Sequence, residues 1–206
     1  MPGEKKGMLN ILLTVGFLIL LAVTAWLVWL ALKPVRAMQT WPGVARTLGL
    51  QYAPMEGATT IHPGTISGVL DGHAVSVEAT GRMRQTYLMT VTVGFRKPLG
   101  IGLRLESDPA LRDQLADHRT YVDFFDEEFR KRFQPRADEP LRAARIVGDG
   151  VVNSVTKRLA KQGKGIRFTD DEIIYFADSV EGRTDKLVSL IRTLVALADR
   201  VESAAK

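Results

Sequence analysis

The sequence contains no cysteine, which excludes disulfides, thiol nucleophiles, zinc–cysteine centres and iron–sulfur clusters. Histidine is scarce: His62, His73 and His118 are the only three, and none has a second ligand at metal-binding spacing. No G-x-S-x-G nucleophile motif occurs, and the GKG at 163–165 lacks the glycine spacing and hydroxyl residue of a phosphate-binding loop. The sequence therefore predicts no catalytic, cofactor-binding or metal-binding residues. We interpret His73, which lies beside an expected turn, as an ordinary surface imidazole.

A strong excess of one charge is also lacking. Lys and Arg number 28 against 23 Asp and Glu, for a formal net charge of +5. Such a mildly basic chain does not require a polyanionic partner. Nucleic acid is disfavoured, because no aromatic stacking platform is expected among the basic residues.

What the chain does contain is a long uncharged run, Met8 to Leu32, interrupted only by the polar side chains of Asn10, Thr14 and Thr24. Its 25 residues would span roughly 37 Å as a helix, enough to cross a hydrocarbon core of about 30 Å. A cleaved signal peptide is the alternative, but its apolar core is shorter and ends in small residues, whereas this run ends in Trp-Leu-Val-Trp-Leu-Ala-Leu. The run predicts a retained transmembrane helix in contact with the lipid bilayer.

The end of the run has the residues expected at a membrane interface: Trp26, Trp29, Lys33 and Arg36. Two basic residues precede the run, and three follow it closely. This excess of one favours, by a narrow margin, a domain on the cytoplasmic side. The predicted organisation is an N-terminal tail (1–7), a transmembrane helix (8–32), a connecting helix and loop (33–63) and a soluble α+β domain (64–206).

The domain is expected to begin with an antiparallel sheet. Asp71-Gly72 lies between alternating residues and predicts a hairpin that pairs Ile66 with Val77 and Leu70 with His73. A polar turn at 81–85 leads to an alternating segment, 86–95. A further alternating segment spans 101–106, with Ile101, Leu103 and Leu105 expected to face inward and Arg104 and Glu106 outward. Four consecutive strands with one apolar face predict a meander with helices packed on that face.

The second half predicts mainly helices. Asp108-Pro109 is typical of a helix start, with Leu111 and Leu115 following on one face. A turn at the acidic residues before 129 and a short strand over 129–133 are expected, then a helix over 141–147. The acidic side chains, Asp126 among them, are expected to balance the charge of the adjacent Arg130–Arg132 run. Asp149 is expected to cap a second helix whose buried side carries Val151, Val152, Val155 and Leu159.

The chain should end with a hairpin and a helix. The hairpin turns at Asp170-Asp171, with Ile166, Phe168, Ile173 and Tyr175 on one face. The last helix, 184–201, has Thr184 as its expected N-cap. It has a broad apolar stripe that predicts packing on the sheet within its own domain. The leucine spacing in that stripe also permits weak self-association as an alternative. The carboxylates at 170–172 are interpreted as a solvated turn rather than a cation site.

One basic cluster remains without an assigned role: Lys157, Arg158, Lys161, Lys164 and Arg167. Charge runs usually form the solvated side of a helix. The functional alternative is contact with anionic lipid, since basic residues near a membrane surface are attracted to its negative charge.

Several short motifs carry a resemblance: a G-x-x-x-G-x-x-V-x-V hairpin from Gly68, GLRL at 102–105, FD-x-x-F at 125–129 and PLRAAR at 140–145. Together they resemble those of uncharacterised bacterial single-pass membrane-anchored α+β proteins with no assigned function. The resemblance implies a bacterial cytoplasmic (inner) membrane protein and carries no site residues.

The leading hypothesis is a membrane-anchored, non-enzymatic interaction or structural module with a protein partner. The alternatives are a membrane-tethered enzyme with a dispersed active site and an anionic-lipid-contacting accessory subunit. No cofactor is expected.

Overall fold

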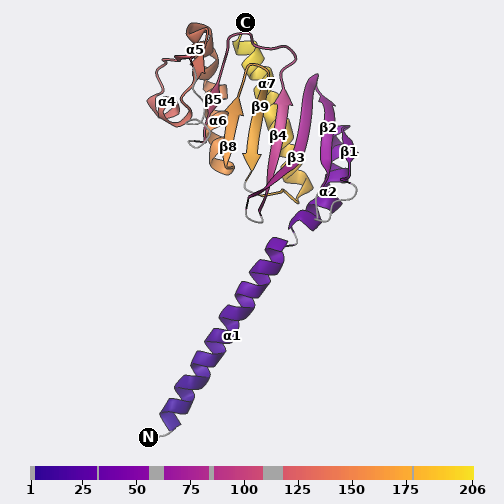
Figure 1. The fold of residues 1–206 in the computed structure, drawn as a ribbon, viewed down its shortest axis with the longest axis vertical. Coiled ribbons are helices and arrows are strands. Elements are labelled where there is room, and N and C mark those ends of the chain that lie inside the picture. Colours follow the sequence, from indigo (N-terminus) through magenta and orange to yellow (C-terminus); the bar gives the residue numbers. More distant parts are fainter. Residues whose placement is uncertain (1–2, 32, 56–62, 84–85, 109–117, 178) are drawn as a thin grey trace.

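The computed structural model describes residues 3–31, 33–55, 63–83, 86–108, 118–177 and 179–206. In chain order its elements are α1 (Gly3–Ala31), α2 (Lys33–Leu48), β1 (Gln51–Ala53), β2 (Thr65–Leu70), β3 (His73–Met83), β4 (Thr86–Gly94), β5 (Leu105–Glu106), β6 (Thr120–Tyr121), α4 (Glu127–Phe133), β7 (Arg136–Ala137), α5 (Pro140–Gly148), α6 (Gly150–Gln162), β8 (Gly165–Phe168), β9 (Glu172–Ala177) and α7 (Thr184–Ala204). Figure 1 shows α1 extending away from a body made of one large sheet and its helices. The α+β class predicted from the sequence is confirmed.

The large sheet has seven antiparallel strands in the order β1-β2-β3-β4-β9-β8-β5. The predicted β2–β3 register is confirmed, with Ile66 opposite Val77 and Leu70 opposite His73. Asp71 and Gly72 both have positive φ, as this type of turn requires. Strand β3 is longer than expected: the residues predicted to form a turn from Gly81 continue the strand to Met83, with a bulge between Thr80 and Arg82.

The predicted four-strand meander is only partly right, because its fourth strand is not beside the third. The β8–β9 hairpin inserts there: Val91 of β4 lies opposite Tyr175 of β9, and β5 pairs with β8 at the far edge. Ile101, Leu103 and Leu105 are buried as predicted, although only Leu105 and Glu106 form a strand. Glu106, expected to face outward, is buried. Segment 51–63, expected to be a loop, contains β1 at the other edge.

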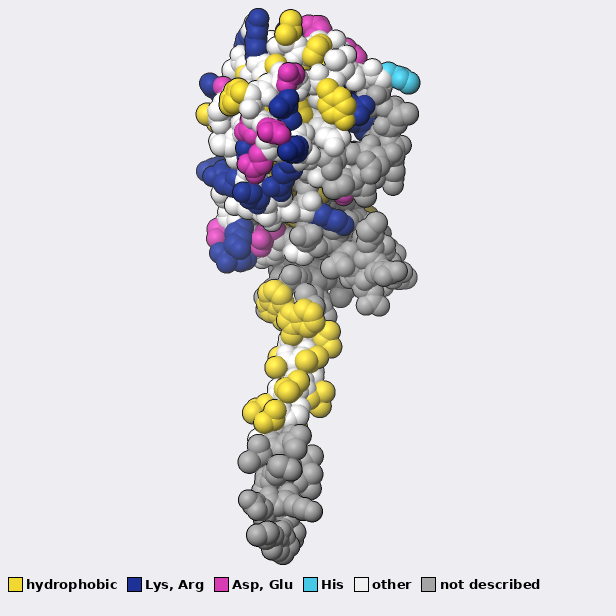
Figure 2. Space-filling view, turned by 90° about the vertical axis from the view of Figure 1, so that its left-hand side faces the viewer, with side chains coloured by type: hydrophobic (Ala, Val, Ile, Leu, Met, Phe, Trp, Pro, Cys, Tyr) yellow, Lys and Arg dark blue, Asp and Glu magenta, His cyan; other side chains and the backbone are white. Residues whose placement is uncertain are grey.

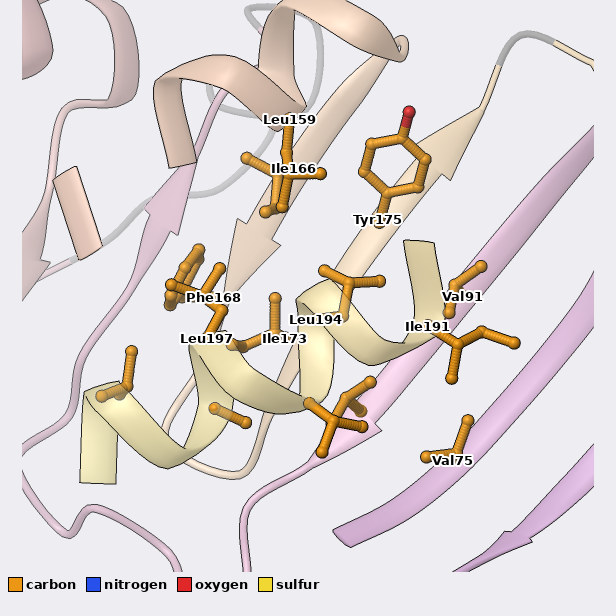
Figure 3. Packing of buried hydrophobic residues seen from close by; sticks show 14 of the residues in the cluster. Val75, Val91, Leu159, Ile166, Phe168, Ile173, Tyr175, Ile191, Leu194 and Leu197 are labelled. Atoms are coloured by element: carbon orange, nitrogen blue, oxygen red, sulfur yellow. The ribbon is translucent and has the colours of Figure 1, made fainter. Parts of the chain in front are cut away.

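Helices α2, α6 and α7 pack on one face of this sheet. Side chains that alternate along the strands toward the helices are almost fully buried, among them Val75, Val91 and Ile173, whereas Ser67 and Glu78 on the opposite face are exposed. Figure 3 shows α7 lying across the strands, with Ile191, Leu194 and Leu197 directed at this inner face. The helix therefore packs inside its own domain, as its broad apolar stripe predicted. It begins at Thr184, although Arg183 rather than Thr184 occupies the N-cap position.

The segment expected to be a strand over 129–133 is instead helix α4, so that prediction is wrong. The Asp126 carboxylate accepts the Phe129 N–H at 2.9 Å and caps the first turn. Phe129 and Phe133, four residues apart, bury the same helix face, with ring centroids 4.4 Å apart. Residues four apart share one face in a helix and also in a strand, so the buried rings fit either element. The Asp126 cap determines that the segment is a helix.

The next two helices follow the sequence prediction closely. Helix α5 contains the predicted 141–147 segment, and Asp149 caps α6 by accepting the N–H groups of Val151 and Val152. Val151 is 51 % exposed, however, so the buried side of α6 is formed by Val152, Thr156 and Leu159 instead. The helix predicted to follow Asp108, and also His62, lie outside the described residues. In the part of the chain that the structure describes, no helix is both long enough and apolar enough to cross a membrane.

Candidate functional site

A hollow between α6 and α7, here called the α6–α7 cavity, has a volume of about 860 Å³. The two helices meet at one end, where Arg200 of α7 donates to both oxygens of Asp149 at the start of α6, at 3.1 and 2.5 Å. Toward the end of α6 and the start of α7, residues of both helices line the hollow. The lining residues are Met89, Arg158, Leu159, Gln162, Tyr175, Ala177, Ser179, Glu181, Asp185, Lys186, Ser189, Leu190 and Thr193.

The floor of the α6–α7 cavity is apolar and comes from the sheet and α6. Met89, Leu159 and Tyr175 are at most 4 % exposed. In Figure 3 the Tyr175 hydroxyl points away from the labelled core residues. A side chain at Gly163 would reach within 2.4 Å of that hydroxyl and 2.6 Å of the Phe176 carbonyl oxygen. Gly163, which ends α6, therefore lets the chain pass closely over the Tyr175 hydroxyl.

The α6–α7 cavity is lined by two carboxylates, Glu181 and Asp185, and by two basic side chains. Arg183 holds both carboxylates: its guanidinium donates to Asp185 at 3.0 Å, and its backbone N–H donates to Glu181 at 2.9 Å. The hydrogen bond from Arg183 lowers the pKa of Asp185. The side chains of Arg158 and Lys186 form no ion pair or hydrogen bond with any residue in the described part of the chain. The cavity lining thus holds two basic side chains, Arg158 and Lys186, without an ion-pair partner in the described residues, together with the carboxylates of Glu181 and Asp185 that Arg183 contacts.

The basic cluster predicted from the sequence is divided by the fold. Lys157 contacts Asp126 at 2.7 Å and Glu128 at 3.5 Å, and the hydrogen bond from Lys157 lowers the pKa of Asp126. Arg167 contacts the buried Glu106 at 2.6 Å. These two cations act within the fold, whereas Arg158 lines the α6–α7 cavity, and Lys161 and Lys164 are exposed near its α6 wall. The predicted lipid contact of the five residues stays a prediction.

His73 is completely buried, so its interpretation as a surface residue was wrong. Its Nδ1 lies 2.9 Å from the Gly94 carbonyl oxygen and its Nε2 lies 3.2 Å from Asp199. Each ring nitrogen thus lies within hydrogen-bond distance of an oxygen, and the tautomer determines which nitrogen donates. A signal in the sequence was available: His73, Val75 and Val77 alternate and therefore share the inner face of β3.

The ligand atoms of His73, Asp199 and Glu202 lie within 4.8 Å of one another, a grouping that could hold a metal ion. Arg96 already occupies this space, with its guanidinium 2.5 Å from Asp199 and 3.1 Å from Glu202. Burial by itself would raise the pKa of Asp199, but the hydrogen bonds from His73 and Arg96 outweigh it and lower that pKa. The cluster is an ion-pair network that joins the β2–β3 and β4 ends to α7.

The acidic turn at 170–172 also has a structural role. The Asp170 carboxylate accepts the N–H groups of Gly102 at 2.9 Å and Leu103 at 2.7 Å. Asp170 therefore holds the loop before β5 in place, and the carboxylate is not simply solvated.

We expect Asp170→Ala to destabilise the domain by about 1–3 kcal/mol, because two part-buried N–H groups lose their acceptor. Urea unfolding of the full-length protein followed by circular dichroism would measure the change. Asp171→Ala is the matched control, since the adjacent side chain is exposed and should shift stability by less than about 0.5 kcal/mol. Equal effects of the two variants would contradict the role given to Asp170.

No family model matches the chain, and no curated protein matches it. Among solved structures, the fold is similar to the crystal structure of the mycobacterial trehalose monomycolate transport factor A, TtfA, with a TM-score of 0.52. The match covers 80 % of this chain and 93 % of that one at 10 % sequence identity. At this identity the likeness establishes a shared α+β fold.

Proposed function

We propose that the chain is a non-enzymatic module, held at the bacterial cytoplasmic membrane by its N-terminal helix, that acts as an accessory factor in the transport of a membrane lipid. The observation that carries the proposal is the unprotected apolar surface of α1. From Val15 to Trp29 its large side chains are exposed, with Phe17 at 61 % and Leu20 at 63 %. Figure 2 shows these side chains along the helix that leads away from the domain. A surface of this kind requires an apolar environment.

Lipid is the environment that best explains this surface. The uncharged run in the sequence, 8–32, is long enough for a bilayer, and only hydroxyl and amide groups interrupt it. Thr24 donates its hydroxyl to the Leu20 carbonyl at 2.7 Å, so this polar group is satisfied within the helix. Trp26 and Trp29 are exposed near the end of α1, and Lys33 and Arg36 follow in α2, an order that suits a membrane interface.

The accessory role has two supports. TtfA, which shares the fold, is a trehalose monomycolate transport factor. In this chain the domain also exposes large apolar side chains beside α5: Phe125 is 85 % and Leu141 is 83 % exposed. The Phe125 ring lies close to Gly148 of α5. Gly148 comes seven residues, about two helical turns, after Leu141, so the two positions share one face of α5. Exposed apolar side chains that share a helix face are typical of a surface that binds another protein.

Alkaline carbonate washing of membranes that contain the full-length protein tests the anchorage. Carbonate releases proteins that are held at a membrane by electrostatic contacts alone, whereas an integral segment stays in the bilayer. We therefore expect the protein to stay in the pellet. A peripheral protein would appear in the supernatant, and this outcome would refute the proposed anchor.

A further inference from the structure

We propose that the α6–α7 cavity binds the anionic phosphodiester headgroup of a membrane phospholipid, an inference that rests on the proposed membrane anchorage. The cavity joins two features that such a headgroup needs. Unneutralised cations lie on its walls, and an apolar floor lies beneath them.

The position of the cavity suits a ligand that comes from the bilayer. Trp41 of α2 is buried and donates its indole N–H to the carbonyl oxygen of Glu181 at 3.0 Å. The cavity rim at Glu181 is therefore attached to α2, the helix that directly follows the proposed anchor. Figure 1 shows β9, whose last residue Ala177 lines the cavity, pointing toward the side of the domain from which α1 leaves. The cavity thus lies at the end of the domain nearest the anchor.

The charges select an anion. Arg158 on α6 and Lys186 on α7 have no carboxylate partner in the described part of the chain, whereas Arg183 holds the carboxylates of Glu181 and Asp185. An arginine offers a planar fork that can donate two parallel hydrogen bonds to a phosphate, and a lysine adds a point charge. A phosphodiester placed between the two helices would accept hydrogen bonds from both side chains and share its single negative charge between them.

The uncharged residues that line the cavity favour a lipid headgroup over an inorganic phosphate ion. Gln162, Ser179 and Ser189 offer amide and hydroxyl groups, which can bind the hydroxyls of a glycerol headgroup. Leu190, which is partly exposed, offers apolar surface to the glycerol backbone and the first carbons of the acyl chains. The volume of about 860 Å³ falls within the roughly 300–1,000 Å³ common for ligand sites.

The test uses the full-length protein in a non-ionic detergent and dihexanoylphosphatidylglycerol as the probe, with native mass spectrometry to measure the one-lipid complex. Phosphatidylcholine with the same acyl chains and inorganic phosphate are the comparison ligands. We expect phosphatidylglycerol to bind at least about tenfold more tightly than either, because only it combines net negative charge with an apolar part. The double variant Arg158→Gln with Lys186→Gln should lose at least about tenfold in affinity.

Arg192→Gln is the matched control. It removes a cation from α7 that is exposed, lies outside the cavity lining and has no partner in the described residues. Since the whole chain is basic, this control measures general attraction to an anionic lipid, and its affinity should equal that of the wild type. The three proteins should have the same thermal midpoint, because the exchanged side chains form no ion pair in the fold.

Equal phosphatidylglycerol binding by the double variant and the wild type would overturn the site. If phosphatidylcholine bound as tightly as phosphatidylglycerol, the cavity would not select an anion. If inorganic phosphate bound as tightly, the ligand would be a phosphate ion and not a lipid headgroup. A wild-type protein that resists carbonate extraction but binds no phosphatidylglycerol would refute this inference alone. Extraction by carbonate with binding retained would refute the anchor alone.

Discussion

Leu194→Asp is expected to unfold the soluble domain. Leu194 is fully buried in the middle of α7, where Figure 3 shows it between the helix and the sheet. A carboxylate there would be desolvated without a partner, at a cost of several kcal/mol, against a total stability of about 5–15 kcal/mol for a typical domain. Thermal denaturation of the full-length protein, followed by circular dichroism, should show a lost or strongly lowered transition.

Ala196→Asp provides the control for Leu194→Asp. It introduces the same charge two residues away on the exposed side of α7 and should leave the transition within a few degrees of the wild type. Light scattering distinguishes the other possibility for the leucine stripe. If Leu194→Asp kept its thermal transition while a dimer became a monomer, α7 would be an oligomer interface and not a core helix.

The second large effect is expected from removal of residues 1–32. A chain that begins at Lys33 should leave the membrane fraction completely and remain folded. Its core needs no residue of α1, since Trp41 and Leu48 of α2 already close the sheet at this end. Cell fractionation measures the partition, and the dispersion of amide resonances in a two-dimensional NMR spectrum measures the fold.

A chain that lacks only residues 1–7 keeps the uncharged run and should stay in the membrane fraction. If both shortened chains were soluble, the run would not be the anchor. Poorly dispersed amide resonances from the chain beginning at Lys33 would show instead that the domain depends on α1 or on a partner for its packing.

Some elements of this fold follow from local chemistry alone. The β2–β3 register depends on the positive φ values that Asp71-Gly72 allows and on a two-residue side-chain period, both of which are readable in the sequence. The α6 start depends on the Asp149 carboxylate, and the inner face of β8–β9 depends on alternation. In each case the determining contacts join residues that are close in the chain.

The α4 helix shows where such reasoning fails. Phe129 and Phe133 fit either a strand or a helix face, and the cap at Asp126 determines the helix. Asp126 was assigned to charge balance with the nearby Arg130–Arg132 run, although its carboxylate pairs with Lys157, 31 residues away. The spacing of the two phenylalanines therefore fits both a strand and a helix, and Lys157, which is distant in the chain, contacts the carboxylate that caps the helix.

The sequence by itself determined the uncharged run, the α+β class, the first hairpin and the buried stripe of α7, because periodicity and turn chemistry are local properties. Only the tertiary structure decided that β9 lies beside β4, that His73 and Glu106 are buried with partners, and that Arg158 and Lys186 line one cavity while Lys157 and Arg167 do not. Periodicity specifies which face of an element is buried. It does not specify which distant element covers that face, and the charges and cavities of the domain depend on that second choice.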